Sequence, residues 1–126
     1  MTTQLKRLAI ILLLAVSTNV AAHGHYPQKV DKYVVDSLIE VEFNLSNHFS
    51  EKTCFDIEVN GEIMSPLRTC LLPGKSKDME VWVHSEPDVE TRNIVCSIAD
   101  NPGSIRTRMC TDSITLFPRN YLSNPQ

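Results

Sequence analysis

Apolar and polar residues alternate along much of this chain. In the stretch LIEVEFNL (residues 38–45), apolar side chains occupy every second position: Ile39, Val41, Phe43 and Leu45. Successive side chains of a β-strand point to opposite faces, so a period of two is typical of a strand with one buried and one solvated face. Helical periodicity is nearly absent from the body of the chain. The pattern therefore predicts an all-β protein.

Two further stretches repeat this alternation and add turn signals. In CFDIEVNGEIM (residues 54–64) the alternation ends at Asn60-Gly61, a dipeptide that favours a tight hairpin. LLPGKSKDMEVWV (residues 71–83) begins with a Pro-Gly turn and predicts a strand with three inward side chains, Met79, Val81 and Val83. Both stretches therefore predict strands bounded by short turns.

The last part of the body predicts another hairpin. RNIVCSIAD (residues 92–100) and IRTRMCTDSITLF (residues 105–117) flank the turn NPGS, and their midpoint lies near Gly103. With KYVVDS (residues 32–37) as a first edge strand, the chain has about seven short strands separated by turns. This profile is typical of an antiparallel β-sandwich.

The first 22 residues have the three parts of a secretory signal. Lys6 and Arg7 form a positive start, the apolar run Leu8–Val16 follows, and VAA (residues 20–22) supplies the small residues that a signal peptidase recognises. The apolar run is shorter than the roughly 20 residues of a membrane-spanning helix. We therefore expect cleavage before His23 and a periplasmic or secreted mature protein without a membrane span.

Beyond this signal peptide (residues 1–22), we expect a flexible segment at 23–29, one folded domain at 30–118 and a flexible tail at 119–126. The whole chain has 12 Lys plus Arg residues, 15 Asp plus Glu residues and a formal net charge of −3. Loss of Lys6 and Arg7 with the leader removes two positive charges and changes the net charge from −3 to −5. An acidic domain lacks the attraction for phosphate backbones on which nucleic-acid binding depends, so no nucleic-acid partner is expected.

The mature part contains four cysteines, Cys54, Cys70, Cys96 and Cys110. An even count behind a secretory signal indicates two disulfides formed in an oxidising compartment. Zinc is the alternative, but the successive spacings of 16, 26 and 14 residues include none of the close ligand pairs of structural zinc sites. We therefore expect two disulfides.

The predicted hairpins favour one disulfide pairing. Cys96 and Cys110 each lie seven residues from Gly103, which places them at facing positions of neighbouring strands, close enough for a disulfide. Cys54 and Cys70 flank the Asn-Gly turn in a similar way, provided that the intervening MSPLRT segment contains an irregular residue or a loop. We favour Cys54–Cys70 and Cys96–Cys110, and the other two connectivities stay open.

The order of these features resembles bacterial immunoglobulin-like domains of envelope and surface proteins. The features are an EFNLSN strand, a CFDIEVNG strand, a LLPGKSKDMEVWV strand and a final hairpin with two cysteines, and they cover nearly the whole mature chain. The resemblance implies an immunoglobulin-like β-sandwich. Antibody-type domains differ, because a cysteine on their second strand bridges the two sheets and this chain has no such cysteine. A shared fold leaves the function open.

The expected mature amino terminus, His23-Gly24-His25, is a candidate metal site. A free terminal amine, two backbone amides and an imidazole at the third position give the square-planar nitrogen set that Cu(II) prefers. Periplasmic copper carriers and lytic polysaccharide monooxygenases also begin with histidine on such a sandwich, and here His48 or His84 would supply their second histidine. Alternatively, both histidines belong to an unstructured terminus without a role, and the protein has no cofactor.

Glu80, Trp82 and His84 form a candidate partner-binding site on the outward face of the third alternating strand. An exposed tryptophan on a strand is a plausible anchor for a protein or glycan partner. Alternatively, a neighbouring side chain or the loop with Pro87 covers Trp82, which would then belong to a satellite core.

No catalytic constellation is evident in the sequence. The cysteines are expected in disulfides, no Gly-x-Ser-x-Gly elbow occurs, and only two histidines lie beyond the expected terminus. We therefore expect a non-catalytic immunoglobulin-like module that binds another envelope or surface protein, as an accessory subunit, a small chaperone or an adhesion component. The alternative is a copper-binding or copper-delivering protein that uses His23 and His25.

Overall fold

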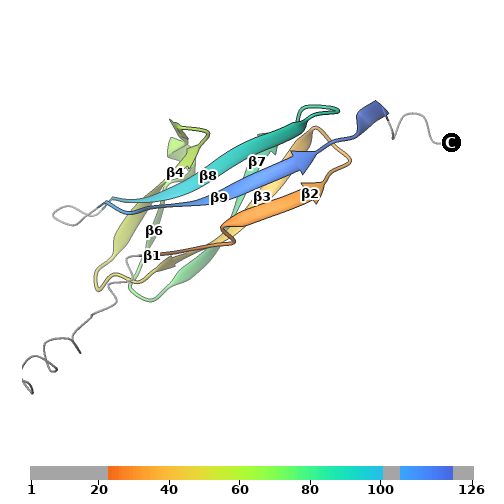
Figure 1. Ribbon diagram of the computed structural model, residues 1–126. Helices are drawn as coiled ribbons and strands as arrows, with labels where there is room; N and C mark the ends of the chain where they lie inside the picture. The colour runs from red at the N-terminus through yellow and green to blue at the C-terminus, as the bar shows by residue number, and fades with distance from the viewer. Residues whose placement is uncertain (1–22, 101–105, 121–126) are drawn as a thin grey trace, which may run out of the picture.

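Two β-sheets lie face to face in this protein (Figure 1). The computed structural model describes residues 23–100 and 106–120. Sheet A has the strand order β1 (His23–Tyr26), β3 (Leu38–Asn47), β7 (Ser76–His84). Sheet B has the strand order β2 (Lys29–Tyr33), β9 (Arg108–Leu116), β8 (Glu90–Asp100), β4 (Thr53–Val59), β5 (Glu62–Ile63). The predicted all-β sandwich is confirmed.

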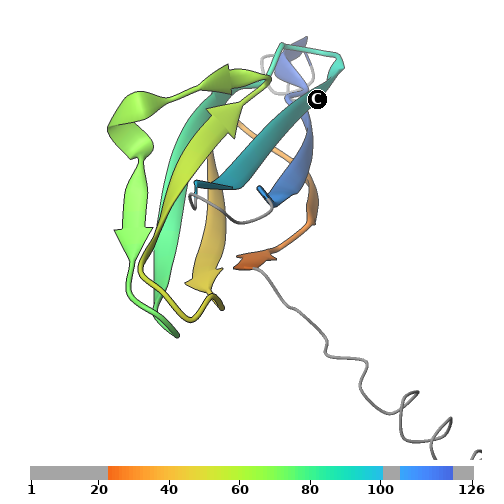
Figure 2. The ribbon, with the colours of Figure 1, turned by 90° about the vertical axis from the view of Figure 1, so that its left-hand side faces the viewer.

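The edge of sheet B beyond β4 contains the irregular elements of the fold. β6 (Thr69–Leu71) pairs with β4, and the short 3₁₀ helix η1 (Ser65–Leu67) precedes it. Figure 2 shows η1 and β6 at the side of the sandwich away from β2. Among the described residues, none of the helices has the length and apolar character needed to cross a membrane.

The core lies between the sheets and consists of the side chains that the alternation assigned to it. β3, β4 and β7 bury every second residue along most of their length. Phe55, Ile57 and Leu45 have no solvent exposure. The remaining buried apolar residues of these three strands are Ile39, Val41, Phe43, Met79, Val81 and Val83. Burial of this apolar surface is the main favourable contribution to folding.

The turns and disulfides agree with the sequence predictions. Asn60 and Gly61 have positive φ angles of 50° and 87° and close the β4–β5 hairpin. The disulfides are Cys54–Cys70 and Cys96–Cys110, and the described part of the chain has no free cysteine. Cys96 faces Cys110 across β8 and β9, as the hairpin argument required.

The expected flexible segment at residues 23–29 differs from the structure. His23–Tyr26 form β1, which pairs antiparallel with the end of β3, and the chain then crosses at a cis Tyr26–Pro27 bond to sheet B. There Lys29–Tyr33 form β2, which pairs in parallel with β9. The physical reason is that β1 buries two side chains, His23 and His25, whose polar character hid the strand in the sequence.

The strand count and pairing change accordingly. The described residues form nine strands instead of about seven, because β1, β5 and β6 are too short for an alternation to reveal. The edge strand expected at residues 32–37 lies earlier, in β2, and its pairing with β9 is the one parallel pairing among the described strands. The signal peptide at 1–22, the turn at 101–104 and most of the tail at 119–126 lie outside the described residues.

Candidate partner-binding face

Sheet A turns a cluster of acidic side chains and one tryptophan toward solvent. β3 and β7 pair so that Glu40 lies opposite Trp82 and Glu42 lies opposite Glu80. Their odd-numbered neighbours fill the core, so these side chains stand on the outer surface. We use the name acidic face for the five outward residues Glu40, Glu42, Asp78, Glu80 and Trp82.

Trp82 is the large aromatic side chain of this face. It is 58% exposed, which differs from the alternative in which Pro87 or a neighbour covers the ring. Large aromatic side chains left in water on a strand are typical of contact surfaces, because they gain much buried area when a partner covers them. Trp82 therefore stands free to contact a partner.

The carboxylates of the acidic face crowd one another. Oxygen atoms of Glu40, Glu42 and Glu80 all lie within 4.8 Å of one another, and exposed groups of this kind can accept a cation. Partial desolvation, the charges of Glu80 and Glu42 and a hydrogen bond with Glu80 raise the pKa of Glu40, while Lys32 opposes this shift. Like charges placed opposite each other on neighbouring strands destabilise a sheet. The arrangement therefore favours a positively charged partner.

The outward carboxylates of sheet B differ from those of sheet A, because several of them have an arginine partner. Four of them form ion pairs with an arginine: Asp56 and Asp100 pair with Arg68, Asp112 with Arg92, and Glu58 with Arg108. The other three, Asp31, Glu62 and Glu90, are exposed and have no ion pair among the described residues. No Lys or Arg among the described residues lies within ion-pair distance of a carboxylate of the acidic face. The acidic face is therefore the place where four unpaired carboxylates lie together on two neighbouring strands.

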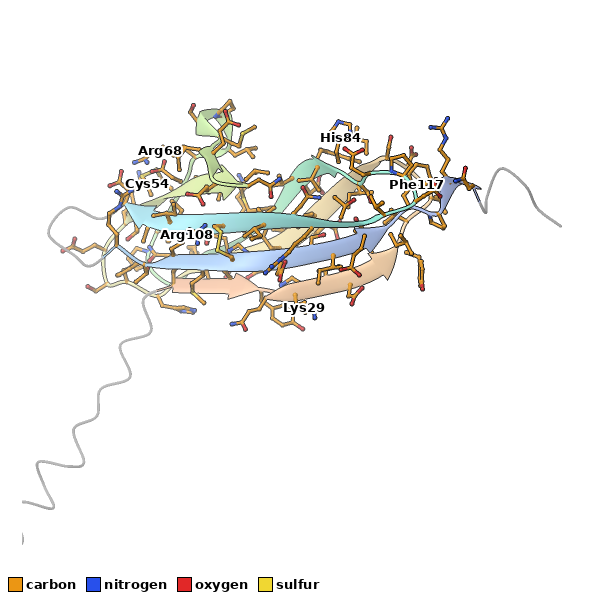
Figure 3. The ribbon with its side chains drawn as sticks, turned by 45° about the horizontal axis from the view of Figure 1, so that its top comes forward. Lys29, Cys54, Arg68, His84, Arg108 and Phe117 are labelled. Carbon is orange, nitrogen blue, oxygen red and sulfur yellow. A yellow bond between two sulfur atoms is a disulfide. The ribbon has the colours of Figure 1, made fainter. Side chains whose placement is uncertain are left out.

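His84, the third residue of the predicted site, lies at the edge of this surface. It ends β7 opposite Leu38, which is 49% exposed. Figure 3 shows His84 near the end of the molecule where Phe117 lies, away from Cys54. The structure therefore brings Glu80 and Trp82 together with the other carboxylates, and His84 forms the end of the same surface.

A groove of about 980 Å³ opens beside the acidic face, between β2 and the edge of β3. Its aliphatic and phenyl lining comes from seven residues: Pro27, Val30, Val34, Val35, Ile39, Val41 and Phe43. Tyr26 and Tyr33 also line it and are 76% and 78% exposed. Ser113 lies among the lining residues, and its buried hydroxyl has no hydrogen-bond partner in the described part of the chain.

The candidate metal residues His23 and His25 point into the sandwich. The His23 ring contacts the hydroxyls of Thr107 at 2.7 Å and Ser97 at 3.0 Å. The His25 ring contacts Ser97 at 2.7 Å and Thr111 at 2.8 Å, and it stacks on Phe43 with a centroid distance of 4.2 Å. Ser97 lies in β8, Thr111 lies in β9 and Thr107 directly precedes β9, so the two imidazoles join sheet A to sheet B through a polar network.

Burial changes the protonation of both imidazoles. Desolvation lowers the pKa of His25 to about 4, and the charge of His23 adds to this shift. The pKa of His23 is lowered as well, mainly by desolvation, although a hydrogen bond with Ser97 opposes the shift. Both rings are therefore neutral at pH 7.

The terminal copper chelate competes with this fold. It would use the backbone amides of β1, which pairs with β3, and the His25 imidazole, which is held inside. His48 lies against β1, with its Nε2 atom 3.0 Å from the position of a Cβ on Gly24, whereas His84 lies at the other end of β3. This chelate would therefore require β1 to leave sheet A.

Glu40 and Glu42 are the functional candidates that sequence reasoning missed. Both alternate with core residues and therefore resemble ordinary solvated side chains. The clustering of these carboxylates depends on the register of β3 against β7, which places Glu42 opposite Glu80. The available signal was that both strands carry acidic residues at outward positions of similar spacing.

Comparisons with known proteins show the fold of this chain. No protein-family model and no curated protein sequence matches it. The solved structure of the E. coli chaperone DraB is similar, with a TM-score of 0.59 and 14% sequence identity over 77% of this chain. The match covers 55% of DraB, so this chain spans about half the length of that protein. At this identity the likeness concerns the arrangement of the strands alone.

Proposed function

We propose that this protein is a non-catalytic, immunoglobulin-like module of the cell envelope that binds an envelope or surface subunit in the manner of a small chaperone. The observation that carries the proposal is the acidic face, where four carboxylates without an ion pair lie on the same two strands as the exposed Trp82. The similarity to the chaperone DraB supports a chaperone-like role. The two disulfides and the secretory features of residues 1–22 support an oxidising, extracytoplasmic location.

The chemistry of the face defines the kind of partner. Clustered carboxylates attract basic side chains and raise the rate of encounter with a positively charged surface. The Trp82 ring offers apolar contact area and can accept an Arg or Lys side chain over its face. A subunit with a basic, partly apolar surface therefore fits this site.

Site-specific photo-cross-linking tests the proposal in cells that produce the protein. A photoreactive phenylalanine analogue replaces Trp82, and the matched control carries it at Ile63, which is 45% exposed on sheet B. We expect one discrete adduct with an exported subunit from position 82 and none from position 63. The steady-state amount of the captured subunit should fall in cells that lack this protein.

Charge reversal tests whether the adduct at position 82 depends on the charge of the acidic face or only on the exposure of that position. Glu80→Lys should abolish the adduct formed at position 82, because it places a positive charge against the basic partner. Glu62→Lys makes the same change on β5 and should leave the adduct unchanged. Equal adducts from positions 82 and 63, or an adduct that survives Glu80→Lys, would contradict the proposal.

A further inference from the structure

The edge of β3 beside the groove is only partly covered. β1 pairs with Asn44–Asn47, whereas residues 38–43 pair only with β7 among the described strands. In an antiparallel ladder the backbone N–H and C=O groups of alternate residues point to opposite sides. Half of these groups in residues 38–43 therefore face the groove without a strand partner, and such an edge can pair with another chain.

The groove continues this edge with an apolar floor. The inward side chains of the free part of β3 are Ile39, Val41 and Phe43, and all three line the groove. Val30 and Val34 close it from the side of β2. The buried Ser113 hydroxyl, which has no hydrogen-bond partner in the described part of the chain, adds a polar group that an occupant could satisfy.

We propose that an extended peptide segment with alternating apolar and basic side chains binds in this groove as an added strand on residues 38–43 of β3. The proposal rests on the proposed function and names its binding site and the chemistry of its partner. Every second side chain of the added strand points into the groove, where apolar groups fit. The side chains between them point outward beside Glu40 and Glu42, where basic groups fit.

Other occupants fit less well. A second copy of this chain paired along the same edge would bring two sets of Glu40 and Glu42 together, which like-charge repulsion disfavours. The chain's own residues 121–126, YLSNPQ, contain no Lys or Arg. Charge complementarity therefore selects a basic segment of another protein.

Titration with a synthetic peptide tests this site on the full mature protein. The probe is a capped peptide of about seven alternating valine and lysine residues, long enough to span the free edge at about 3.3 Å per residue. We expect saturable shifts of the backbone amide resonances of residues 38–43. Glu42→Gln should weaken binding about tenfold, and the matched control Glu62→Gln on β5 should change it less than about twofold.

Peptide variants separate strand addition from charge attraction. Two N-methylated peptides are compared, one methylated at every valine and the other at every lysine. Only one of them loses the N–H groups that face β3, so only that peptide should fail to bind. A peptide in which valine alternates with glutamate should not bind. Equal binding of the two N-methylated peptides, or no amide shifts at residues 38–43, would overturn the proposal.

Two outcomes are distinguishable from failure of the proposed function. If the peptide fails to bind while the photoreactive residue at position 82 still cross-links to a subunit in cells, the partner binds the acidic face without adding a strand. If the amides of residues 38–43 become protected as the protein concentration rises in the absence of peptide, a second copy occupies the edge and the proposed occupant is wrong.

Discussion

At the scale of single residues, the sandwich depends on two buried histidines. His23 and His25 reach from β1 to the hydroxyls of Ser97 and Thr111 in sheet B and of Thr107, which precedes β9. Burying a polar group without a partner costs on the order of 1–3 kcal/mol, so these hydrogen bonds offset the desolvation of both rings. The network holds the first strand of the described chain in place only while the rings are neutral.

The stability of the fold should therefore depend on pH. The pKa of His25 is about 4 in the folded protein and 6.5 for an unperturbed histidine, so between these values the unfolded chain binds a proton that the folded chain does not. The contribution of His25 to the free energy of unfolding is therefore complete above about pH 6.5, and it falls as the pH decreases toward 4. At about 1.4 kcal/mol per pKa unit, the loss between pH 7.5 and 5 is on the order of 2 kcal/mol.

Urea unfolding at pH 7.5 and pH 5 measures this difference. In His25→Gln, which can still bond to Ser97 and Thr111 but does not titrate, the pH dependence should shrink to the part that His23 supplies. The buried network would be contradicted if the wild-type protein had equal stability at both pH values. It would also be contradicted if the variant kept the full pH dependence of the wild-type protein.

The crowded carboxylates predict a substitution that stabilises the fold. Glu80→Gln removes a negative charge that faces Glu42, and it should raise the free energy of unfolding by about 0.2–1 kcal/mol while weakening capture of the partner. Glu58→Gln is the matched control, because it removes the ion pair with Arg108 and should be neutral or slightly destabilising. Thermal unfolding distinguishes the two: a Glu80→Gln variant less stable than wild type would show that Glu80 supports the fold.

Chemistry at this scale was only partly predictable from the sequence. Exposure of Trp82 followed from its place between Val81 and Val83, because alternation alone decides the face of a strand. The environment of His25 did not, since it depends on hydroxyls more than 70 residues away in the sequence. Long-range packing of polar groups leaves no periodic trace in a sequence.

At the scale of elements, the two disulfides reinforce sheet B. Cys54–Cys70 joins β4 to β6, and Cys96–Cys110 joins β8 to β9, whereas sheet A has no covalent link among the described residues. A crosslink that closes a loop of about 15 residues stabilises a protein by roughly 3 kcal/mol in the chain-entropy model. Both crosslinks among the described residues therefore join strands of sheet B.

Removing one disulfide should lower the stability of the fold without changing the exposure of Trp82 on the acidic face. The double variant Cys96→Ala/Cys110→Ala should lose on the order of 3 kcal/mol of unfolding free energy in urea, because the unfolded chain gains freedom. Iodide quenching of the single tryptophan should stay the same below the unfolding transition, because Trp82 is already exposed on the other sheet. A loss below about 1 kcal/mol, or a changed quenching in the native state, would contradict this division of roles.

Elements were predictable where the pattern is long and one-sided. β3, β4 and β7 bury alternate residues, and the turn after β4 and the turn before β7 carry Asn-Gly and Pro-Gly. β9 turns Thr111, Ser113 and Thr115 inward, so its buried face is polar and carries no apolar pattern. The crossing of β1 and β2 between sheets also lacks a pattern, because pairing partners are chosen by tertiary contacts.

At the scale of the whole molecule, the two outer surfaces differ in charge. On sheet B, Arg68, Arg92 and Arg108 pair with four of the outward carboxylates. On sheet A, the carboxylates of the acidic face have no ion pair among the described residues and lie near Trp82 and an open groove. Natural proteins accept such local destabilisation mainly where a function requires it. We propose that the acidic face and the free edge of β3 together form the binding side of the sandwich.

Amide hydrogen exchange of the protein with and without its captured subunit tests this central claim most directly. We expect binding to increase protection in β3 and β7, with the largest gain at residues 38–43, and to leave β4 and β8 unchanged. A complex in which protection rises across β4 and β8 while β3 and β7 keep the exchange rates of the free protein would contradict the account, because sheet B would then be the binding surface.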